Sequence, residues 1–359
     1  MDKKNSAMWG VDDRIKKLAE EYPELVLGRV LSQEKDLYRL ITNEGECFAR
    51  VSGKFRYEAV NTSDFPAVGD FVMVDHVCED SPGVIHILLP RKSVFVRKAA
   101  GTSHTEQVVA ANIDTVFLCM ALNNDFNVRR LERYLSIAWD SGAVPVIVLT
   151  KSDLCKNLEE KRLAVEMAAI GVDVVETSAL EKDRIKPLFP YLQGGKTVAF
   201  IGSSGVGKST LINCLLGEER LATGGLRDDD KGRHTTTRRE LLFLPDGGMV
   251  IDTPGMRELG MWDAGDGIDR TFVDIEELAQ QCRFHDCTHT SEPGCAICKA
   301  LEKGELSRER FISYQKLKNE NDYIEDAESY LVAKEKKFKE IAKYNKNNKK
   351  RKMFENPLQ

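Results

Sequence analysis

The chain of 359 residues is long enough for two or three domains of roughly 150 residues each, and its 42% hydrophobic and 30% charged residues exclude a wholly disordered or collagen-like protein. Its 52 basic and 57 acidic residues give a net charge of −5, which excludes a uniformly basic nucleic-acid coat protein. The longest apolar runs are only as long as strands, so we expect no membrane span. No apolar segment follows Met1, so we expect a cytoplasmic location, where the nine cysteines serve as thiols or metal ligands.

The first part of the chain is predicted to form a small β-barrel. Short runs such as Val26–Val30, Leu37–Leu40 and Phe71–Val74 alternate with Gly, Asp and Pro turns from about Leu25 to Arg97. Regular spacing of short strands is typical of all-β barrels.

The middle of the chain has a different rhythm, which predicts an α/β domain. Continuous apolar runs are typical of buried parallel strands; they cover residues 115–122, 144–149, 172–175, 198–201 and 249–251. Between them, residues 128–139 and 159–170 have helical periodicity, as expected of crossover helices. After Asp274 the strand pattern stops, and residues 305–344 read as a charged helix of a third, small domain.

A phosphate-binding loop follows the apolar run at 198–201. Residues 202–209 fit G-x-x-x-x-G-K-[ST], and an amphipathic helix follows at 210–216. The glycines let backbone N–H groups turn toward phosphates, Lys208 neutralises charge and takes part in catalysis, and the Ser209 hydroxyl reaches Mg²⁺. The predicted nucleotide contacts of this loop are Gly202, Ser203, Ser204, Gly205, Val206, Gly207, Lys208, Ser209 and Thr210.

Two further segments complete the expected phosphate and magnesium site. Asp252-Thr253-Pro254-Gly255 ends an apolar run, where Asp252 can hold Mg²⁺ through water and the Gly255 N–H can sense the γ-phosphate. Before it, residues 232–237 read Gly-Arg-His-Thr-Thr-Thr after a Gly-rich stretch suited to a switch, and Thr236 is the expected additional Mg²⁺ ligand and catalytic residue. A threonine run is also ordinary edge-strand sequence, so this alternative stays open.

The base-reading residues decide between kinases, ATPases and GTPases. Thr150-Lys151-Ser152-Asp153 ends the run 144–149 and resembles the guanine-reading [NT]-K-x-D motif. A carboxylate such as Asp153 accepts from both N1–H and the exocyclic amine of guanine, a donor pair that adenine lacks. Ser178 and Ala179, just after another predicted strand, resemble the companion loop that supports the base.

The order of these motifs is reversed, because the base motifs precede the phosphate loop, as in circularly permuted GTPases. A predicted β-barrel precedes the permuted domain, the segments 232–237 and 252–255 lie within it, and a Cys/His cluster follows it. In this combination, nearly the whole chain resembles the ribosome small subunit-dependent GTPase A family. The resemblance implies an OB-fold barrel, a permuted GTPase domain, a zinc domain, and GTP hydrolysis in late maturation of the bacterial small ribosomal subunit, which is the expected partner and activator.

The resemblance also implies the domain limits and a catalytic residue. The expected parts are a helical extension (1–24), an OB-fold RNA-binding domain (25–98), the permuted GTPase domain (99–273), a helical zinc-binding domain (274–345) and a basic flexible tail (346–359). Met256 stands where many GTPases carry glutamine and cannot orient water, so His234, the family's proposed switch histidine, is the catalytic candidate. A solvent-facing loop histidine is the alternative.

The Cys/His cluster predicts a structural zinc ion. Cys282, Cys287, His289 and Cys295 give C-x₄-C-x-H-x₅-C, four soft ligands that leave no open position for catalysis. Free core cysteines are the alternative, but a loop with Pro293 and Gly294 has little other reason to hold this much sulfur.

Two regions are expected to contact ribosomal RNA. Basic and aromatic residues that can neutralise phosphate and stack on bases punctuate the barrel, namely Arg29, Arg39, Arg50, Lys54, Arg56, Tyr38, Phe48, Phe55 and Tyr57. Residues 331–359 contain ten Lys/Arg and three Glu, a composition suited to phosphate contact. Both patterns also fit ordinary solvated surfaces, and a nucleotide-gated RNA-binding module with slow resetting hydrolysis is the alternative function. We expect a monomer that binds GTP, GDP, Mg²⁺ and one Zn²⁺.

Overall fold

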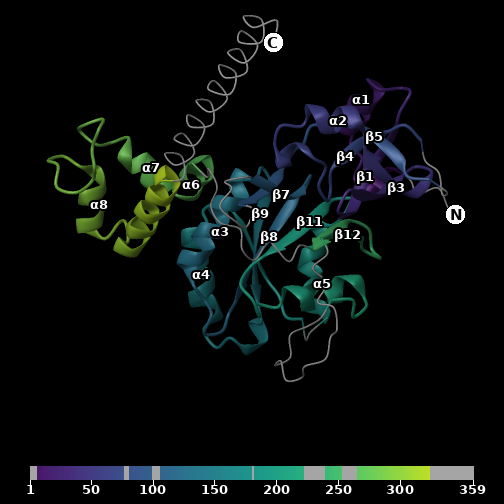
Figure 1. Ribbon diagram of the computed structural model, residues 1–359. Helices are drawn as coiled ribbons and strands as arrows, with labels where there is room; N and C mark the ends of the chain where they lie inside the picture. The colour runs from purple at the N-terminus through teal and green to yellow at the C-terminus, as the bar shows by residue number, and fades with distance from the viewer. Residues whose placement is uncertain are drawn as a thin grey trace, which may run out of the picture.

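The computed structural model describes residues 6–76, 81–98, 106–179, 182–221, 239–252 and 265–323. Figure 1 shows three parts: the barrel and the C-terminal helices lie on opposite sides of a central α/β domain. Within the described ranges, no helix has the length and apolar character needed to cross a membrane. The predicted tail 346–359 and the part of the predicted helix beyond residue 323 lie outside them.

The N-terminal part is the expected five-stranded barrel, preceded by the short helices η1 (Ser6–Trp9) and α1 (Asp13–Glu20). Its elements are β1 (Val26–Glu34), β2 (Leu37–Thr42), β3 (Gly45–Val51), α2 (Gly53–Glu58), η2 (Thr62–Asp64), β4 (Phe71–Val74) and β5 (Gly83–Leu88). The strands pair in the order β1-β2-β3-β5-β4, and a β1–β4 pairing closes the barrel. This closed order, with a helix between the third and fourth strands, confirms the OB-like barrel.

Helix α2 interrupts a region that the sequence pattern predicted as all-β. The Ser52 side chain accepts a hydrogen bond from the Phe55 backbone N–H at 3.0 Å, which caps the first turn. Along β3 the residues alternate in burial: Cys47, Ala49 and Val51 point inward, whereas Phe48 and Arg50 point to solvent. The alternation therefore sets the barrel's outer face.

The central domain is a mostly parallel sheet with helices on both faces. Its strands are β8 (Thr115–Ala121), β9 (Val144–Thr150), β10 (Asp173–Glu176), β11 (Thr197–Ile201), β12 (Glu240–Phe243) and β13 (Met249–Asp252), in the order β10-β9-β8-β11-β13-β12. Only β12 runs antiparallel to its neighbour in this sheet. The helices are α3 (Val128–Asp140), η3 (Ser152–Leu154), α4 (Leu158–Ala168), η4 (Lys182–Tyr191) and α5 (Lys208–Leu216). Every residue of β8 is buried, as expected for a strand covered on both faces.

Strand β11 occupies the topological switch point of this sheet. The strands on one side of it, β8, β9 and β10, precede it in the chain, and those on the other side, β13 and β12, follow it. Ligands of open α/β sheets bind outside the carboxyl ends of the strands at such a point. The loop after β11 is the predicted phosphate loop, so topology and motif indicate the same position.

The barrel and the α/β domain share a continuous sheet. Strand β12 pairs with β1 at Glu240 and Ser32, which makes one sheet of 11 strands. A separate hairpin of β6 (Val94–Lys98) and β7 (Glu106–Ala111) spans the expected domain boundary at residue 98.

Arg29 is an interdomain residue, which corrects its assignment as an RNA contact. Its side chain is 1% exposed and donates hydrogen bonds to Trp9 O at 2.8 Å, Gly69 O at 3.1 Å, Asn112 O at 3.2 Å and Thr197 Oγ1 at 2.8 Å. Burial lowers the pKa of Arg29 to about 10, so the guanidinium stays charged at neutral pH. Tyr38 is 2% exposed and likewise unavailable for RNA stacking.

The C-terminal part is helical, as predicted. It contains α6 (Gly265–Thr271), α7 (Val273–Ala279), α8 (Ala296–Lys303) and a helical stretch over residues 308–323. Arg310 joins it to the α/β domain, since its guanidinium contacts Glu132 of α3 at 2.9 Å and Asp274 of α7 at 2.7 Å.

Candidate functional site: a nucleotide site and a cysteine–histidine cluster

The phosphate loop turns from β11 into α5 through left-handed glycines. Gly205 and Gly207 have φ values of +75° and +108°, and Gly207 is the N-cap of α5. A Cβ on Gly202 would lie 2.6 Å from Cys119 O, so the loop also needs glycine for close packing on β8. The loop therefore has the backbone that its motif requires.

The Lys208 side chain folds back onto this loop. Its side chain is 8% exposed, and Nζ donates to Gly202 O at 2.5 Å and Ser203 O at 2.7 Å. Both carbonyls belong to the start of the phosphate loop, and Lys208 itself is the first residue of α5. A buried ammonium and a helix N-terminus together favour a bound anion at this position.

The structure brings the base motif and the phosphate loop together, although about fifty residues separate them. Thr150 Oγ1 donates to Val206 O at 2.6 Å, and Lys151 Nζ donates to Gly205 O at 2.8 Å. Lys151 has a left-handed backbone with φ of +58°, and its side chain reaches the loop at Gly205. These two bonds fix the end of β9 against the phosphate loop.

The other predicted base residues lie beside Asp153. Ser178 Oγ donates to Asp153 Oδ1 at 2.7 Å, and Ser152 Oγ donates to Thr177 O at 3.0 Å. The Cys214 thiol of α5 contacts Ala179 O at 3.8 Å. The loops after β9 and β10 and helix α5 thus form one connected group.

The magnesium candidates are placed in part. Asp252 ends β13, which runs parallel to β11, and Ser209 lies in the first turn of α5. Thr236, His234 and Gly255 lie outside the described residues.

The sequence reading missed Asp125, which supports the phosphate loop. Ser203 Oγ donates to Asp125 Oδ2 at 2.6 Å, and Arg130 NH1 donates to both carboxylate oxygens of Asp125 at 2.9 and 2.8 Å. The hydrogen bond from Ser203, followed by that from Arg130, lowers the pKa of Asp125. Its place just after β8, at the carboxyl edge of a parallel sheet, is the signal that would have found it.

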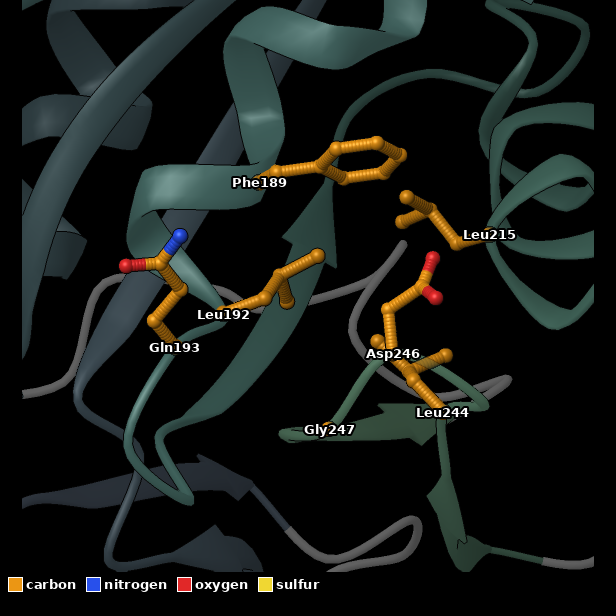
Figure 2. Close-up of a pocket in the computed structure, with 7 residues that line it drawn as sticks. All are labelled: Phe189, Leu192, Gln193, Leu215, Leu244, Asp246 and Gly247. Carbon is orange, nitrogen blue, oxygen red and sulfur yellow. The ribbon is translucent and has the colours of Figure 1, made fainter.

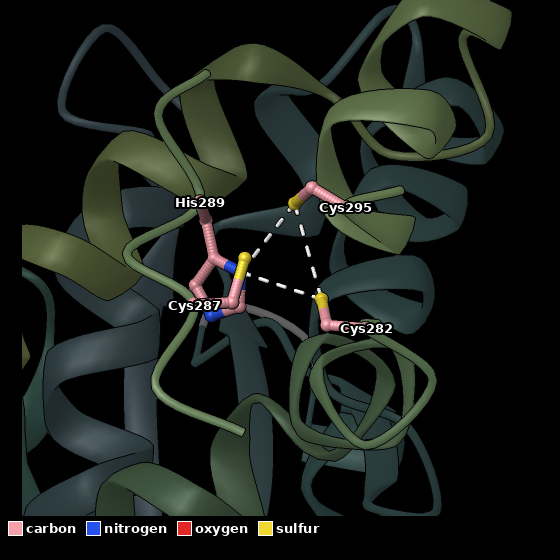
Figure 3. A group of neighbouring side chains, drawn as sticks. All are labelled: Cys282, Cys287, His289 and Cys295. Carbon is pink, nitrogen blue, oxygen red and sulfur yellow. Dashed lines mark hydrogen bonds between the residues drawn. The ribbon is translucent and has the colours of Figure 1, made fainter. Parts of the chain in front are cut away.

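The predicted zinc residues converge in space (Figure 3), with all four ligand atoms within 4.8 Å of one another. Cys282 Sγ and Cys295 Sγ each lie 3.6 Å from His289 Nδ1 and 3.9 Å from each other. Tetrahedral zinc with ordinary bond lengths requires sulfur–nitrogen edges of about 3.6 Å and sulfur–sulfur edges of about 3.8 Å. The donor set and these three edges therefore fit zinc, with Cys287 as the fourth ligand nearby.

The electrostatics of the cluster without metal differ between its thiols, since burial raises the pKa of Cys287 to about 11 whereas the pKa of Cys295 is lowered. Burial acts to raise the pKa of Cys295, but the Cys298 N–H and His289 hold it at about 6, which favours the thiolate that binds metals. Cys298 itself turns its thiol to His289 O at 3.5 Å and stays outside the group of four.

A separate pocket of about 110 Å³ lies between η4, the end of α5 and the turn after β12 (Figure 2). It is lined by Phe189, Leu192, Gln193, Leu215, Leu244, Asp246 and Gly247. Small-molecule sites usually enclose at least about 300 Å³, and none of the predicted nucleotide residues lines this pocket. It is not the nucleotide site.

Residues 88–262 match the sequence profile of a family described as "RsgA GTPase". "Small ribosomal subunit biogenesis GTPase RsgA 2" of Lactiplantibacillus plantarum is 54% identical over 299 residues, which are 83% of this chain and 84% of that protein. This chain belongs to the RsgA GTPase family. "Small ribosomal subunit biogenesis GTPase RsgA 1" of Oceanobacillus iheyensis is 44% identical over 90% of this chain and 93% of that protein. Another profile, described as "50S ribosome-binding GTPase", matches residues 197–353.

Solved structures show the same fold. YjeQ from Thermotoga maritima is similar with a TM-score of 0.63 and 28% identity, over 83% of this chain and 98% of that one. YloQ, titled a circularly permuted GTPase, is similar with a TM-score of 0.61 and 25% identity, over 84% of this chain and 96% of that one. These findings confirm the predicted family and the permuted GTPase fold. They also confirm that this chain is a GTP hydrolase.

Proposed function

We propose that this GTPase acts in biogenesis of the small ribosomal subunit, binds that subunit and is activated by it. The names of its relatives support the ribosomal role, since they match most of the chain at 44–54% identity. The observation that carries the nucleotide assignment is the pair of hydrogen bonds from Thr150 and Lys151 to the phosphate loop, because it sets base and phosphate recognition side by side.

Guanine recognition is assigned to Asp153. Its Oδ1 accepts from Ser178 Oγ at 2.7 Å, which restrains the carboxylate while leaving lone pairs for two guanine N–H donors. Lys151 would lie along the base, and Ala179 would support it from the other loop. A site built for two donors discriminates strongly against a base that lacks them.

The phosphates are assigned to the loop 202–209, with Lys208 neutralising their charge. Ser209 and Asp252 fit a Mg²⁺ site, as oxygen donors at the carboxyl edge of neighbouring strands, with Thr236 as the further ligand. When bound, Mg²⁺ neutralises charge that develops on the phosphate oxygens. The Gly255 N–H would contact the γ-phosphate, and His234 would orient the attacking water.

The cluster of Cys282, Cys287, His289 and Cys295 is assigned to one structural zinc ion. The fit of the three distances among Cys282, His289 and Cys295 to a tetrahedron supports this assignment, and four protein ligands leave no coordination position for substrate. The metal would hold the loop between α7 and α8 in place.

Ribosomal RNA is assigned to the outer face of the barrel and the basic tail. Phe48 and Tyr57 are 48% and 90% exposed, and Arg50, Lys54 and Arg56 are exposed on the same two elements, β3 and α2. Exposed rings beside cations suit unstacked bases and phosphates. We further propose that the protein is a cytoplasmic monomer.

The test is GTP turnover by the full chain alone, with small subunits and with large subunits. We expect strong stimulation by small subunits that declines with added salt, because phosphate contacts release counterions. Equal turnover with and without small subunits would refute the ribosomal assignment, and stimulation by large subunits alone would replace it.

A further inference from the structure

The barrel holds both ends of the strand that carries Asp252. Strand β13 has only four residues, Met249–Asp252. At its start, Arg29 of the barrel donates to Met249 Sδ at 3.3 Å. At its end, Asp252 is paired across the ladder with Glu240 of β12, and Glu240 is paired with Ser32 of the barrel strand β1.

The strand registers extend this pairing into a lateral row. Ser32 is paired with Arg39 on β2, and Arg39 with Phe48 on β3. Directly paired residues of antiparallel strands project from the same face of the sheet. The row therefore runs from exposed Phe48 through Arg39, Ser32 and Glu240 to Asp252, and four strand spacings of about 4.8 Å give it a length of about 19 Å.

Charged side chains connect the middle of this row. Glu240 Oε1 accepts from Arg39 NH2 at 2.9 Å, and its Oε2 accepts from Arg220 NH2 at 3.0 Å. The Glu240 and Arg39 side chains are 22% and 34% exposed, and Ser32 between them is 5% exposed. Arg39 thus pairs with a carboxylate of the α/β domain while its side chain stays partly exposed on the barrel's outer face.

We propose that the Arg39–Glu240 pair positions Asp252 and transmits binding at the barrel's outer face to the magnesium site. Arg39 is confined between Glu240 and Glu46, whose Oε2 lies 3.7 Å from Arg39 Nε, so movement of the barrel surface at β3 displaces the guanidinium. Because Glu240 and Asp252 share a ladder position, the displacement reaches the carboxylate at the end of β13. The part of this proposal that concerns the ribosome rests on the proposed function.

The first experiment needs no ribosome. Binding of a fluorescent GDP analogue to the full chain is titrated with Mg²⁺ for the wild type, Arg39→Ala, Glu240→Gln and the double variant. We expect each single change to raise the half-saturating Mg²⁺ concentration about fivefold, and the double variant to resemble the more affected single one. Unchanged Mg²⁺ dependence in Arg39→Ala, or effects that multiply in the double variant, would overturn the proposal.

The matched control is Arg162 of α4, which contacts the edge strand β10 at the end of the sheet away from the barrel. Arg162 also pairs with two carboxylates, Glu166 at 2.8 Å and Glu176 at 3.1 Å, and its side chain is 42% exposed. Arg162→Ala should keep the wild-type Mg²⁺ dependence. Arg39→Lys keeps the charge and should recover most of the Mg²⁺ affinity, and thermal melting of each variant checks that the barrel is folded.

The second experiment measures turnover with saturating small subunits. Arg39→Ala should lose at least about threefold of the stimulation while co-sedimenting with subunits as the wild type does, whereas Arg50→Ala should mainly weaken co-sedimentation. Full stimulation of Arg39→Ala would refute transmission from the barrel. If the wild type itself is not stimulated, the ribosomal function fails, and the Mg²⁺ titration alone decides whether the pair positions Asp252.

Discussion

Replacing Arg310 with alanine should detach the C-terminal helices from the GTPase domain. The Glu132 side chain is 0% exposed and Arg310 is 8% exposed, with NH1 of Arg310 donating to Glu132 Oε1 at 2.9 Å. The same guanidinium donates to Ala168 O at 3.2 Å and Thr271 O at 3.0 Å, and pairs with Asp274. One side chain therefore joins α3, α4, α6 and α7.

The expected loss follows from these exposures. Breaking a buried ion pair by removing one partner costs about 3–5 kcal/mol, mainly because the other charge is stranded. After Arg310→Ala, Glu132 keeps Arg129, which is 40% exposed, so we expect a loss near the lower end of that range. The pair with Asp274, which is 30% exposed, adds at most about 1 kcal/mol.

A double variant tests whether the stranded charge carries the cost. Urea unfolding followed by circular dichroism is compared for the wild type, Arg310→Ala, Glu132→Gln and the double variant. Neutralising Glu132 should restore about 2 kcal/mol to Arg310→Ala, because a buried amide costs less than a buried carboxylate whose remaining partner is the partly exposed Arg129. The reasoning is wrong if the double variant is less stable than Arg310→Ala alone, or if Arg310→Ala unfolds as the wild type does.

Three further predictions concern the assigned sites. Asp153→Asn should weaken GTP binding by a few kcal/mol, about a hundredfold, and relax discrimination against ATP in competition titrations; equal wild-type affinity for ATP and GTP would contradict the guanine assignment. Ser209→Ala should impair Mg²⁺-dependent GTP binding or turnover. His234→Ala should keep the wild-type affinity for GTP and lower turnover on small subunits. If His234→Ala turns over GTP at the wild-type rate, His234 is not the water-orienting group. Metal analysis of protein purified under reducing conditions should find one Zn²⁺ per chain. Cys287→Ser and His289→Ala should each lose the metal and the protease resistance of the C-terminal helices, but should still bind GTP. Wild-type protein without zinc would refute the assignment.

Patterns within short segments of the sequence predicted the buried strands, the phosphate loop and the Cys/His cluster. The strands β8, β9, β11 and β13 lie within a residue or two of the apolar runs, because a strand covered on both faces has few polar positions to confuse the pattern. The phosphate loop and the cluster around His289 were found for a similar reason, since spacing within a short segment sets their geometry.

Contacts between distant segments could not be predicted in this way. Arg29 and Arg39 look like surface cations of a barrel, yet one is buried against β11 and β13 and the other pairs with Glu240, 201 positions away. Asp125 stands in an ordinary turn sequence, and only the fold places it against Ser203. A charged side chain at an outward-facing position of an alternating strand pattern is predicted to reach solvent. Whether another domain covers that position depends on the tertiary structure.

The two attached domains meet the phosphate site through different elements. The barrel connects through β12 to Asp252 on one side of β11. On the other side, helix α3 begins beside Asp125, which supports the phosphate loop, and one turn later carries Glu132, which holds Arg310 of the C-terminal helices. Neither β13 nor α3 contains a glycine or a proline, residues at which such elements often bend. A surface that contacts both domains at once would therefore touch elements on both sides of the phosphate loop, because the barrel and the C-terminal helices lie on opposite sides of the α/β domain.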